Sequence, residues 1–217
     1  MDVNLKVIDI SHHNVGPNGG AIDFEAIAAY GIRGVIHKAS QGVGMADRMY
    51  DVRRKAALDA GLLWGAYHFA TGDDADAQVR QFLRAAEPDD NTLMALDHEP
   101  YNGNELDLEG AQAFLESLRD QLGRKPIIYS GNLIKEQTAR NPSLNGFFGQ
   151  FRYWLCQYGP KAIVPAAWRE TGAWLWQFSG DGVANRGLSV PGLKNGSTID
   201  MNSFAGSDEE LAAQWAS

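Results

Sequence analysis

Short apolar runs that favour β-strands recur along the chain, and helical patterns separate the earlier ones. The strand-like runs lie at 6–11, 34–40, 62–70, 92–99, 125–131, 152–159, 173–180 and 197–204. The helical patterns lie at 23–31, 49–61, 74–87 and 107–123, with a shorter one at 132–140. Strands that alternate with helices form parallel sheets through right-handed crossovers, so this alternation constrains the fold more than any other feature.

The pattern at 107–123 shows the helical signal most clearly. Its apolar residues form one stripe at helical spacing: Leu108, Ala111, Leu115, Leu118 and Leu122. Asp107 precedes the stripe as a suitable N-cap, and Gly123 follows it as a suitable C-terminal stop.

The predicted fold class is therefore α/β, as a single TIM-like (β/α) barrel with eight strands. The helical coat is reduced over the last strands, because the links at 160–172 and 181–196 are rich in Pro and Gly and show little helical periodicity. A doubly wound open sheet is the alternative architecture. No repeat, low-complexity tract or linker divides the chain, so we expect residues 1–217 to form one catalytic barrel domain.

Charge and composition narrow the classes of partner. The formal net charge is −8, which argues against nucleic acid or an anionic membrane as a partner, because both attract clustered Lys and Arg. Cys156 is the only cysteine, so no internal disulfide forms. The segment "MDVNLKVIDISHHN" lacks the apolar core of a signal peptide, and no run has membrane-spanning length. We expect a monomer that is synthesised in the cytoplasm, does not insert into membranes and acts after release.

Polar residues stand at the C-terminal ends of the predicted strands, where barrel enzymes place their active sites. Acidic residues occur at three of these ends: Asp9, the pair Asp97 and Glu99, and Asp200. The candidates for substrate binding share the same location: Lys38, Tyr67, His68, Tyr129, Tyr158, Gln177 and Asn202. Acids at three separate strand ends indicate a catalytic site.

Asp97 and Glu99 stand two residues apart in "LMALDHEP". Strand residues i and i+2 point to the same face, so both carboxyls are expected to face the barrel mouth while Leu96 and His98 face the helices. When two carboxyl groups are neighbours, the negative charge of one raises the pKa of the other, and an apolar environment raises that pKa further. A carboxylic acid that keeps its proton is what a glycosidase needs to protonate a leaving oxygen. A D-x-E pair is common, and the pair gains meaning only beside Asp9 and Asp200.

Aromatic residues suggest a sugar substrate. The chain has 6 Trp, 7 Tyr and 9 Phe, and sugar rings pack their C–H faces on aromatic planes. Most of these rings are expected in the core. Tyr67, Tyr129 and Tyr158 are the ones predicted to line a cleft.

Several segments together resemble glycoside hydrolase family 25, the lysozymes (N-acetylmuramidases) of bacteria, phages and fungi. These are "VIDISHHN", "GVIHKASQG", "GAYHFA", "LMALDHEP", "KPIIYSG", "LWQFSGDG" and "STIDMNSF", in order along nearly the whole chain. The resemblance implies an eight-stranded barrel that cleaves the β-1,4 bond between N-acetylmuramic acid and N-acetylglucosamine in peptidoglycan glycan strands, as an endolysin does, without a metal or other cofactor. It also implies Glu99 as proton donor, Asp97 as its partner, and Asp9 and Asp200 as the rest of the acidic cluster.

The chain departs from the family pattern at the edge of the expected cleft. Gln41 stands where the family usually has Glu, Asn14 stands where it often has Gln, and the doubled His12–His13 is unusual. We expect these positions to border the cleft and to affect substrate preference.

Two other classes remain as alternatives. Histidines near the strand ends suggest a metal-dependent barrel hydrolase, but His12 and His13 are adjacent and are expected to diverge, and His37 and His98 are out of phase with Lys38 and Asp97. An inactive carbohydrate-binding barrel is the other, although such proteins typically lose the acid, which Glu99 supplies here.

Overall fold

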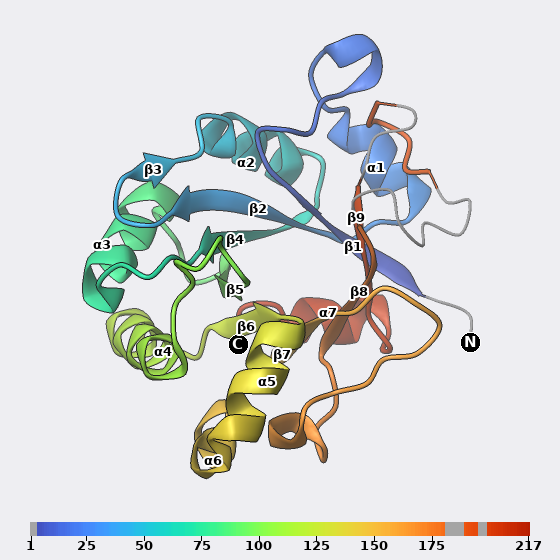
Figure 1. Ribbon diagram of the computed structural model, residues 1–217. Helices are drawn as coiled ribbons and strands as arrows, with labels where there is room; N and C mark the ends of the chain where they lie inside the picture. Colours follow the sequence, from blue (N-terminus) through green and yellow to red (C-terminus); the bar gives the residue numbers. More distant parts are fainter. Residues whose placement is uncertain (1–3, 181–188, 195–198) are drawn as a thin grey trace.

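The structure is a computed structural model that describes residues 4–180, 189–194 and 199–217 (Figure 1). Its strands are β1 (Leu5–Ile10), β2 (Gly34–Gln41), β3 (Met45–Ala46), β4 (Leu63–Phe69), β5 (Leu93–His98), β6 (Ile127–Ser130), β7 (Tyr153–Cys156), β8 (Leu175–Ser179) and β9 (Asp200–Ser203). Its α-helices are α1 (Phe24–Tyr30), α2 (Tyr50–Asp59), α3 (Ala75–Ala86), α4 (Leu108–Leu122), α5 (Asn132–Arg140), α6 (Asn145–Phe148) and α7 (Asp208–Gln214). Three 3-10 turns are η1 (Pro17–Gly19), η2 (Pro142–Leu144) and η3 (Ala166–Trp168).

The sheet closes into a barrel. Its strands pair in the order β1-β9-β8-β7-β6-β5-β4-β2, and a further pairing between β1 and β2 joins the two ends. The short strand β3 extends β2 as an antiparallel hairpin outside this ring. The predicted eight-stranded barrel is confirmed, and the closure between β1 and β2 excludes the open doubly wound sheet.

The direction of the last strand differs from the prediction. Strand β9 runs antiparallel to both β1 and β8, whereas the sequence pattern predicted parallel strands throughout. An antiparallel pair needs no helical crossover, which agrees with the lack of helical periodicity in the link before β9. The consequence is that the N-terminal end of β9, with Asp200, lies level with Asp9 near the C-terminal end of β1.

Helices coat one part of the barrel more than another. In Figure 1, α2, α3 and α4 lie around the outside of β2, β4 and β5. Between β7 and β8 the described structure contains only the turn η3, so the predicted loss of helices is confirmed for the link at 160–172. Most of the second such link, at 181–196, lies outside the described residues. Helix α4 has the predicted ends, since the Asp107 side chain accepts a hydrogen bond from Gly110 N and Gly123 takes a left-handed conformation. No helix in the described ranges is long and apolar enough to cross a membrane.

The C-terminal helix α7 was not predicted. Ser207 and Glu210 form a capping box at its start, and this Ser-x-x-Glu spacing is a local sequence signal for the beginning of a helix. The Trp215 side chain after this helix donates a hydrogen bond to Trp64 O at 2.7 Å, and its ring presses on the backbone of Gly34. Because Gly34 and Trp64 stand at the start of their strands, α7 and Trp215 close the end of the barrel opposite the predicted site.

Candidate active site

A cavity opens at the end of the barrel where the parallel strands finish. Its lining residues come from β1, β2, β4, β5, β6, β7, β8 and β9 and from the segments that follow them: Asp9, Ser11, His13, Lys38, Tyr67, Phe69, Asp97, Glu99, Tyr129, Trp154, Gln177 and Asp200. The four acidic residues predicted at strand ends are therefore brought together around one cavity.

Asp97 and Glu99 face this cavity for the reason given by strand phase. Leu96, the residue before Asp97 on β5, packs in the apolar layer under the helices. The His98 ring bonds to the Gln137 side chain of α5 at 2.7 Å and is fully buried on the helical side. The alternation along β5 thus separates residues that face the cavity from residues that hold the helices.

Asp97 is a buried carboxyl of the cavity with a strongly raised pKa. Its side chain is almost fully buried, and among the described residues its Oδ1 atom has no hydrogen-bond partner. Burial raises the pKa of the Asp97 carboxyl well above its usual range, and the neighbouring Glu99 charge raises it further, while Lys38 opposes this. The Lys38 ammonium bonds to Gln41 Oε1 at 2.6 Å and lies over the Phe69 ring, 4.8 Å from its centroid.

Asp9 is held by two amide side chains whose orientation is fixed from behind. Asn202 Nδ2 donates to Asp9 Oδ2 at 2.7 Å, and Gln177 Nε2 donates to the same oxygen at 3.1 Å. The oxygen of each amide accepts a further hydrogen bond. Trp154 Nε1 donates to Asn202 Oδ1 at 2.6 Å, and the Tyr129 hydroxyl donates to Gln177 Oε1 at 2.8 Å. Because their oxygens are engaged, both amides present N–H groups to the carboxylate.

A second hollow adjoins the acidic cavity. It is lined by Glu99, Pro100, Gly131, Asn132, Cys156, Gln157 and Tyr158. Glu99 lines both hollows, so this residue stands between them. A chain-like substrate that lies across both would carry one of its linkages past Glu99.

The sequence profile described as Glycosyl hydrolases family 25 matches residues 8–186. The chain belongs to glycosyl hydrolase family 25. This agrees with the resemblance found in the strand segments.

This family 25 chain is similar in sequence to several bacterial proteins and in fold to several lysozymes of known structure. YegX of Escherichia coli O157:H7 is 31% identical over 183 residues, which make up 81% of this chain and 60% of YegX, so the chain spans about 60% of that relative's length. Lysozyme M1 of Streptomyces globisporus is 25% identical over 225 residues, covering 96% of this chain and 70% of that protein. The structure of the bacterial lysozyme from Streptomyces coelicolor matches with a TM-score of 0.82 at 23% identity, covering 100% of this chain and 99% of that one. A family GH25 lysozyme from Aspergillus fumigatus matches with a TM-score of 0.76 at 24% identity, covering 98% and 99%. These structural likenesses show that the fold is shared.

The predicted substrate residues fall into three groups in this family 25 barrel. Lys38, Tyr67, Tyr129 and Gln177 line the acidic cavity, and Tyr158 lines the adjoining hollow. Asn202 is fully buried beneath the cavity and donates a hydrogen bond to the Asp9 carboxylate. It lies deeper than predicted because β9 enters the barrel at Asp200 and runs away from the mouth.

The prediction for His68 was wrong. Its ring points to the helical layer, bonds to Ser40 Oγ at 2.8 Å and Gln78 Oε1 at 3.1 Å, and stacks on Phe114 at 5.3 Å. The two-residue period of β4 explains this, because Tyr67 and Phe69 face the cavity and the residue between them faces outward. Burial lowers the pKa of His68 to about 4, so the ring is a neutral structural group.

Four cavity residues were not predicted as site residues: Ser11, His13, Phe69 and Trp154. Phe69 shares the phase of Tyr67, so the strand period was a usable signal. His13 was expected only to border the cleft, and Trp154 had been counted among aromatic residues of the core. Among the described residues no three His, Cys, Asp or Glu side chains form a group suited to a metal ion.

Gly180 brings two cavity groups close to the backbone, which gives a first testable prediction. A Cβ atom at this position would lie 2.2 Å from the Tyr158 hydroxyl and 2.5 Å from Asp200 Oδ1. Gly180→Ala must therefore displace one or both groups. We expect kcat/KM to fall by about ten- to hundredfold, because misplacing a reacting or binding group by about 1 Å costs this much. Steady-state kinetics with a thermal unfolding control test this, and unchanged kinetics would show that neither group contributes.

Proposed function

We propose that the protein is a muramidase that cleaves the β-1,4 bond between N-acetylmuramic acid and N-acetylglucosamine in peptidoglycan, and that it acts at the cell wall as an endolysin-like lysozyme. The observation that carries this proposal is the position of Glu99, shared by an acidic, aromatic-lined cavity and a second hollow beside it. Such a cleft accommodates a glycan on both sides of a single acid. Membership of family 25 and the relatives named as lysozymes support the same activity.

In the proposed reaction, Glu99 gives its proton to the leaving glycosidic oxygen. The side chains of Asp97 and Glu99 project from the same face of the same strand. This arrangement suits an Asp97 that assists the side of the sugar on which Glu99 acts, and does not suit an Asp97 that attacks the opposite face of the ring. The 2-acetamido group of the substrate can supply the attacking oxygen, with Asp97 orienting its N–H and offsetting the developing positive charge. Asp9 and Asp200 then hold sugar hydroxyls or the water that completes hydrolysis.

The anomer of the first product distinguishes this route from its competitor. Acetamido assistance retains configuration, whereas activation of a water by Asp9 or Asp200 inverts it. We expect the β-anomer to form first from the β-linked substrate, with no trapped glycosyl-enzyme. NMR of the earliest products measures this, and an initial α-anomer would instead assign Asp9 or Asp200 as the base.

The proposed activity itself is tested by mass analysis of the fragments released from purified peptidoglycan. Fragments with N-acetylmuramic acid at the new reducing end are expected, and any other cleaved bond contradicts the proposal. The same assay separates the alternatives. A metal-dependent hydrolase would lose activity after exhaustive chelation, and an inactive carbohydrate-binding barrel would bind the glycan without releasing reducing ends.

A further inference from the structure

The turn that follows β1 forms one wall of the acidic cavity. Ser11 and His13 line the cavity from this turn, and the His13 side chain is exposed. The turn bonds to itself through Asn14, whose Oδ1 accepts from Ser11 N at 2.8 Å and whose N donates to Ser11 O at 3.0 Å. These bonds hold the turn in shape but do not attach it to the barrel.

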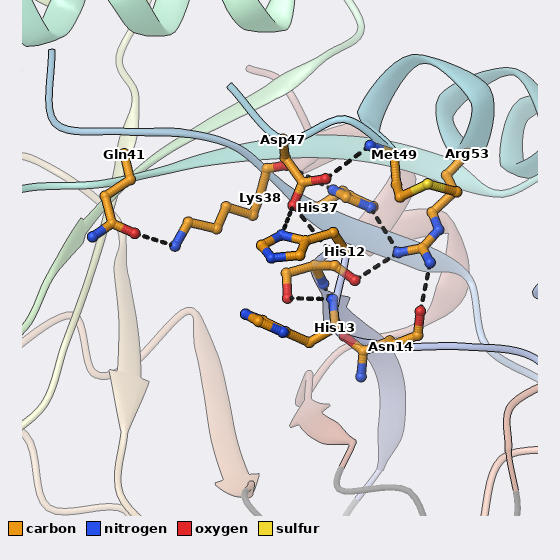
Figure 2. A network of polar contacts seen from close by, with 10 residues as sticks. His12, His13, Asn14, His37, Lys38, Gln41, Asp47, Met49 and Arg53 are labelled. Atoms are coloured by element: carbon orange, nitrogen blue, oxygen red, sulfur yellow. Dashed lines mark hydrogen bonds and ion pairs between the residues drawn. The ribbon is translucent and has the colours of Figure 1, made fainter. Parts of the chain in front are cut away.

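Arg53 of α2 attaches the turn from behind. Its guanidinium, almost fully buried, donates to Ser11 O at 2.6 Å and to Asn14 O, the first and last residues of the turn (Figure 2). Another of its contacts is to the His37 Nε2 atom, at 3.2 Å. The His37 Nδ1–H donates to Lys38 O at 2.7 Å, and burial lowers the pKa of His37 to about 4, so its Nε2 atom is free to accept from Arg53.

Asp47 fixes the middle of the turn. Its buried carboxylate accepts from both His12 N at 2.9 Å and His12 Nδ1 at 2.8 Å, and also from Met49 N at 2.9 Å. The His12 ring packs against the His13 ring, with centroids 3.9 Å apart, so the expectation that these two side chains diverge was wrong. Both residues are drawn in Figure 2. The exposed ring at the cavity edge is therefore supported by a second ring that a buried carboxylate holds in place.

We infer that the turn of residues 11–14 is a substrate-binding wall in which His13 contacts a sugar of the glycan, and that Asp47 and Arg53 are its positioning residues. This inference rests on the proposed function. Its physical basis is preorganisation: a ring held in its binding position loses little conformational freedom when a sugar packs on it. Arg53 and Asp47 lie 42 and 35 residues beyond Ser11 and His12, so only the closed barrel brings them to this turn.

Binding measured without turnover tests the inference. In a Glu99→Gln background, calorimetry with a purified disaccharide-repeat fragment of peptidoglycan gives Kd directly. His13→Ala is expected to weaken binding about three- to tenfold, the loss that one aromatic contact typically represents. An unchanged Kd would overturn the assignment of His13.

A double-mutant cycle separates positioning from general stability. Asp47→Asn should raise Kd when His13 is present and have little effect in the His13→Ala protein, because it acts through that ring. Equal effects in both backgrounds would overturn the positioning role. If Asp47→Asn does not fold, His12→Phe takes its place, since it keeps a ring against His13 but lacks the bond to Asp47.

Arg54 offers a matched control for Arg53 on the same helix. It also donates to two main-chain oxygens, Ala86 O at 3.2 Å and Glu87 O at 2.8 Å, but neither residue lines the cavity. Arg53→Lys should raise Kd while Arg54→Lys should not, even where both lower the melting temperature. Equal Kd values in the two variants would refute the role of Arg53. Wild-type protein that binds the fragment but cleaves no peptidoglycan would overturn the proposed function and leave these binding results to decide this inference.

Discussion

Glu99→Gln is expected to lower the rate of peptidoglycan cleavage by about 10²–10⁴-fold, the usual contribution of general acid catalysis. Gln keeps the size and hydrogen bonding of the side chain but has no transferable proton. The effect should fall on kcat, because the substitution leaves the two hollows on either side of position 99 intact. Reducing-end release from purified cell walls measures the rate.

A control acid and the pH profile complete this test. Glu109 lies exposed in the first turn of α4 and outside both hollows, so Glu109→Gln should retain normal activity. The wild-type profile of kcat/KM against pH should be bell-shaped, and its basic limb should disappear when Glu99 is replaced. Near-normal turnover by Glu99→Gln at its own optimum would reject Glu99 as the acid.

Asp97→Asn is expected to have opposite effects on catalysis and on stability. Activity should fall by about 10²–10³-fold, the cost of removing one preorganised electrostatic group from an active site. The fold should become more stable at neutral pH, because the native Asp97 carboxyl is buried with an unpartnered Oδ1 among the described residues. A gain of about 1–3 kcal/mol in the free energy of unfolding is expected from relieving that burial.

The dependence of this gain on pH follows from the direction of the pKa shift. Folding raises the pKa of Asp97 above its ordinary value of 3.8, so the native state binds a proton more tightly than the unfolded chain does. The destabilisation of the wild type therefore grows as pH rises from 3.8 toward the native pKa, and it vanishes below 3.8. Melting temperatures of wild type and Asp97→Asn should differ at neutral pH and converge in acid. A stability gain that persists unchanged in acid would contradict this origin.

Asp47→Asn is the matched contrast, since Asp47 is also buried but its carboxylate accepts three hydrogen bonds. Bonds from Met49 N and His12 outweigh burial and lower the pKa of Asp47 below 3.8. Its charged form therefore stabilises the fold above 3.8, and this contribution is lost as pH falls through the native pKa. The same substitution should thus destabilise the protein here. Matching signs at Asp47 and Asp97 would show that hydrogen bonding does not decide the difference.

Features that depend on neighbours in the sequence were predictable. The eight strand runs, the helices α1 to α5 and the caps of α4 follow from hydrophobic period and end residues, which act within a few positions, whereas the short helix α6 was not predicted. The shared direction of Asp97 and Glu99 follows from the same two-residue period, which also contradicts the prediction for His68. Helix α7 was missed although Ser207 and Glu210 carry a local capping signal.

The sequence by itself determined which side chains stand near strand ends and which face of a strand they share, because both depend on local backbone geometry. Only the tertiary structure decided that β9 runs antiparallel, which sets Asp200 at the mouth and sends Asn202 below it to hold Asp9. It also decided that Asp47 and Arg53 hold the turn after β1. These contacts join residues far apart in the chain, and their geometry exists only once strand direction and barrel closure are fixed.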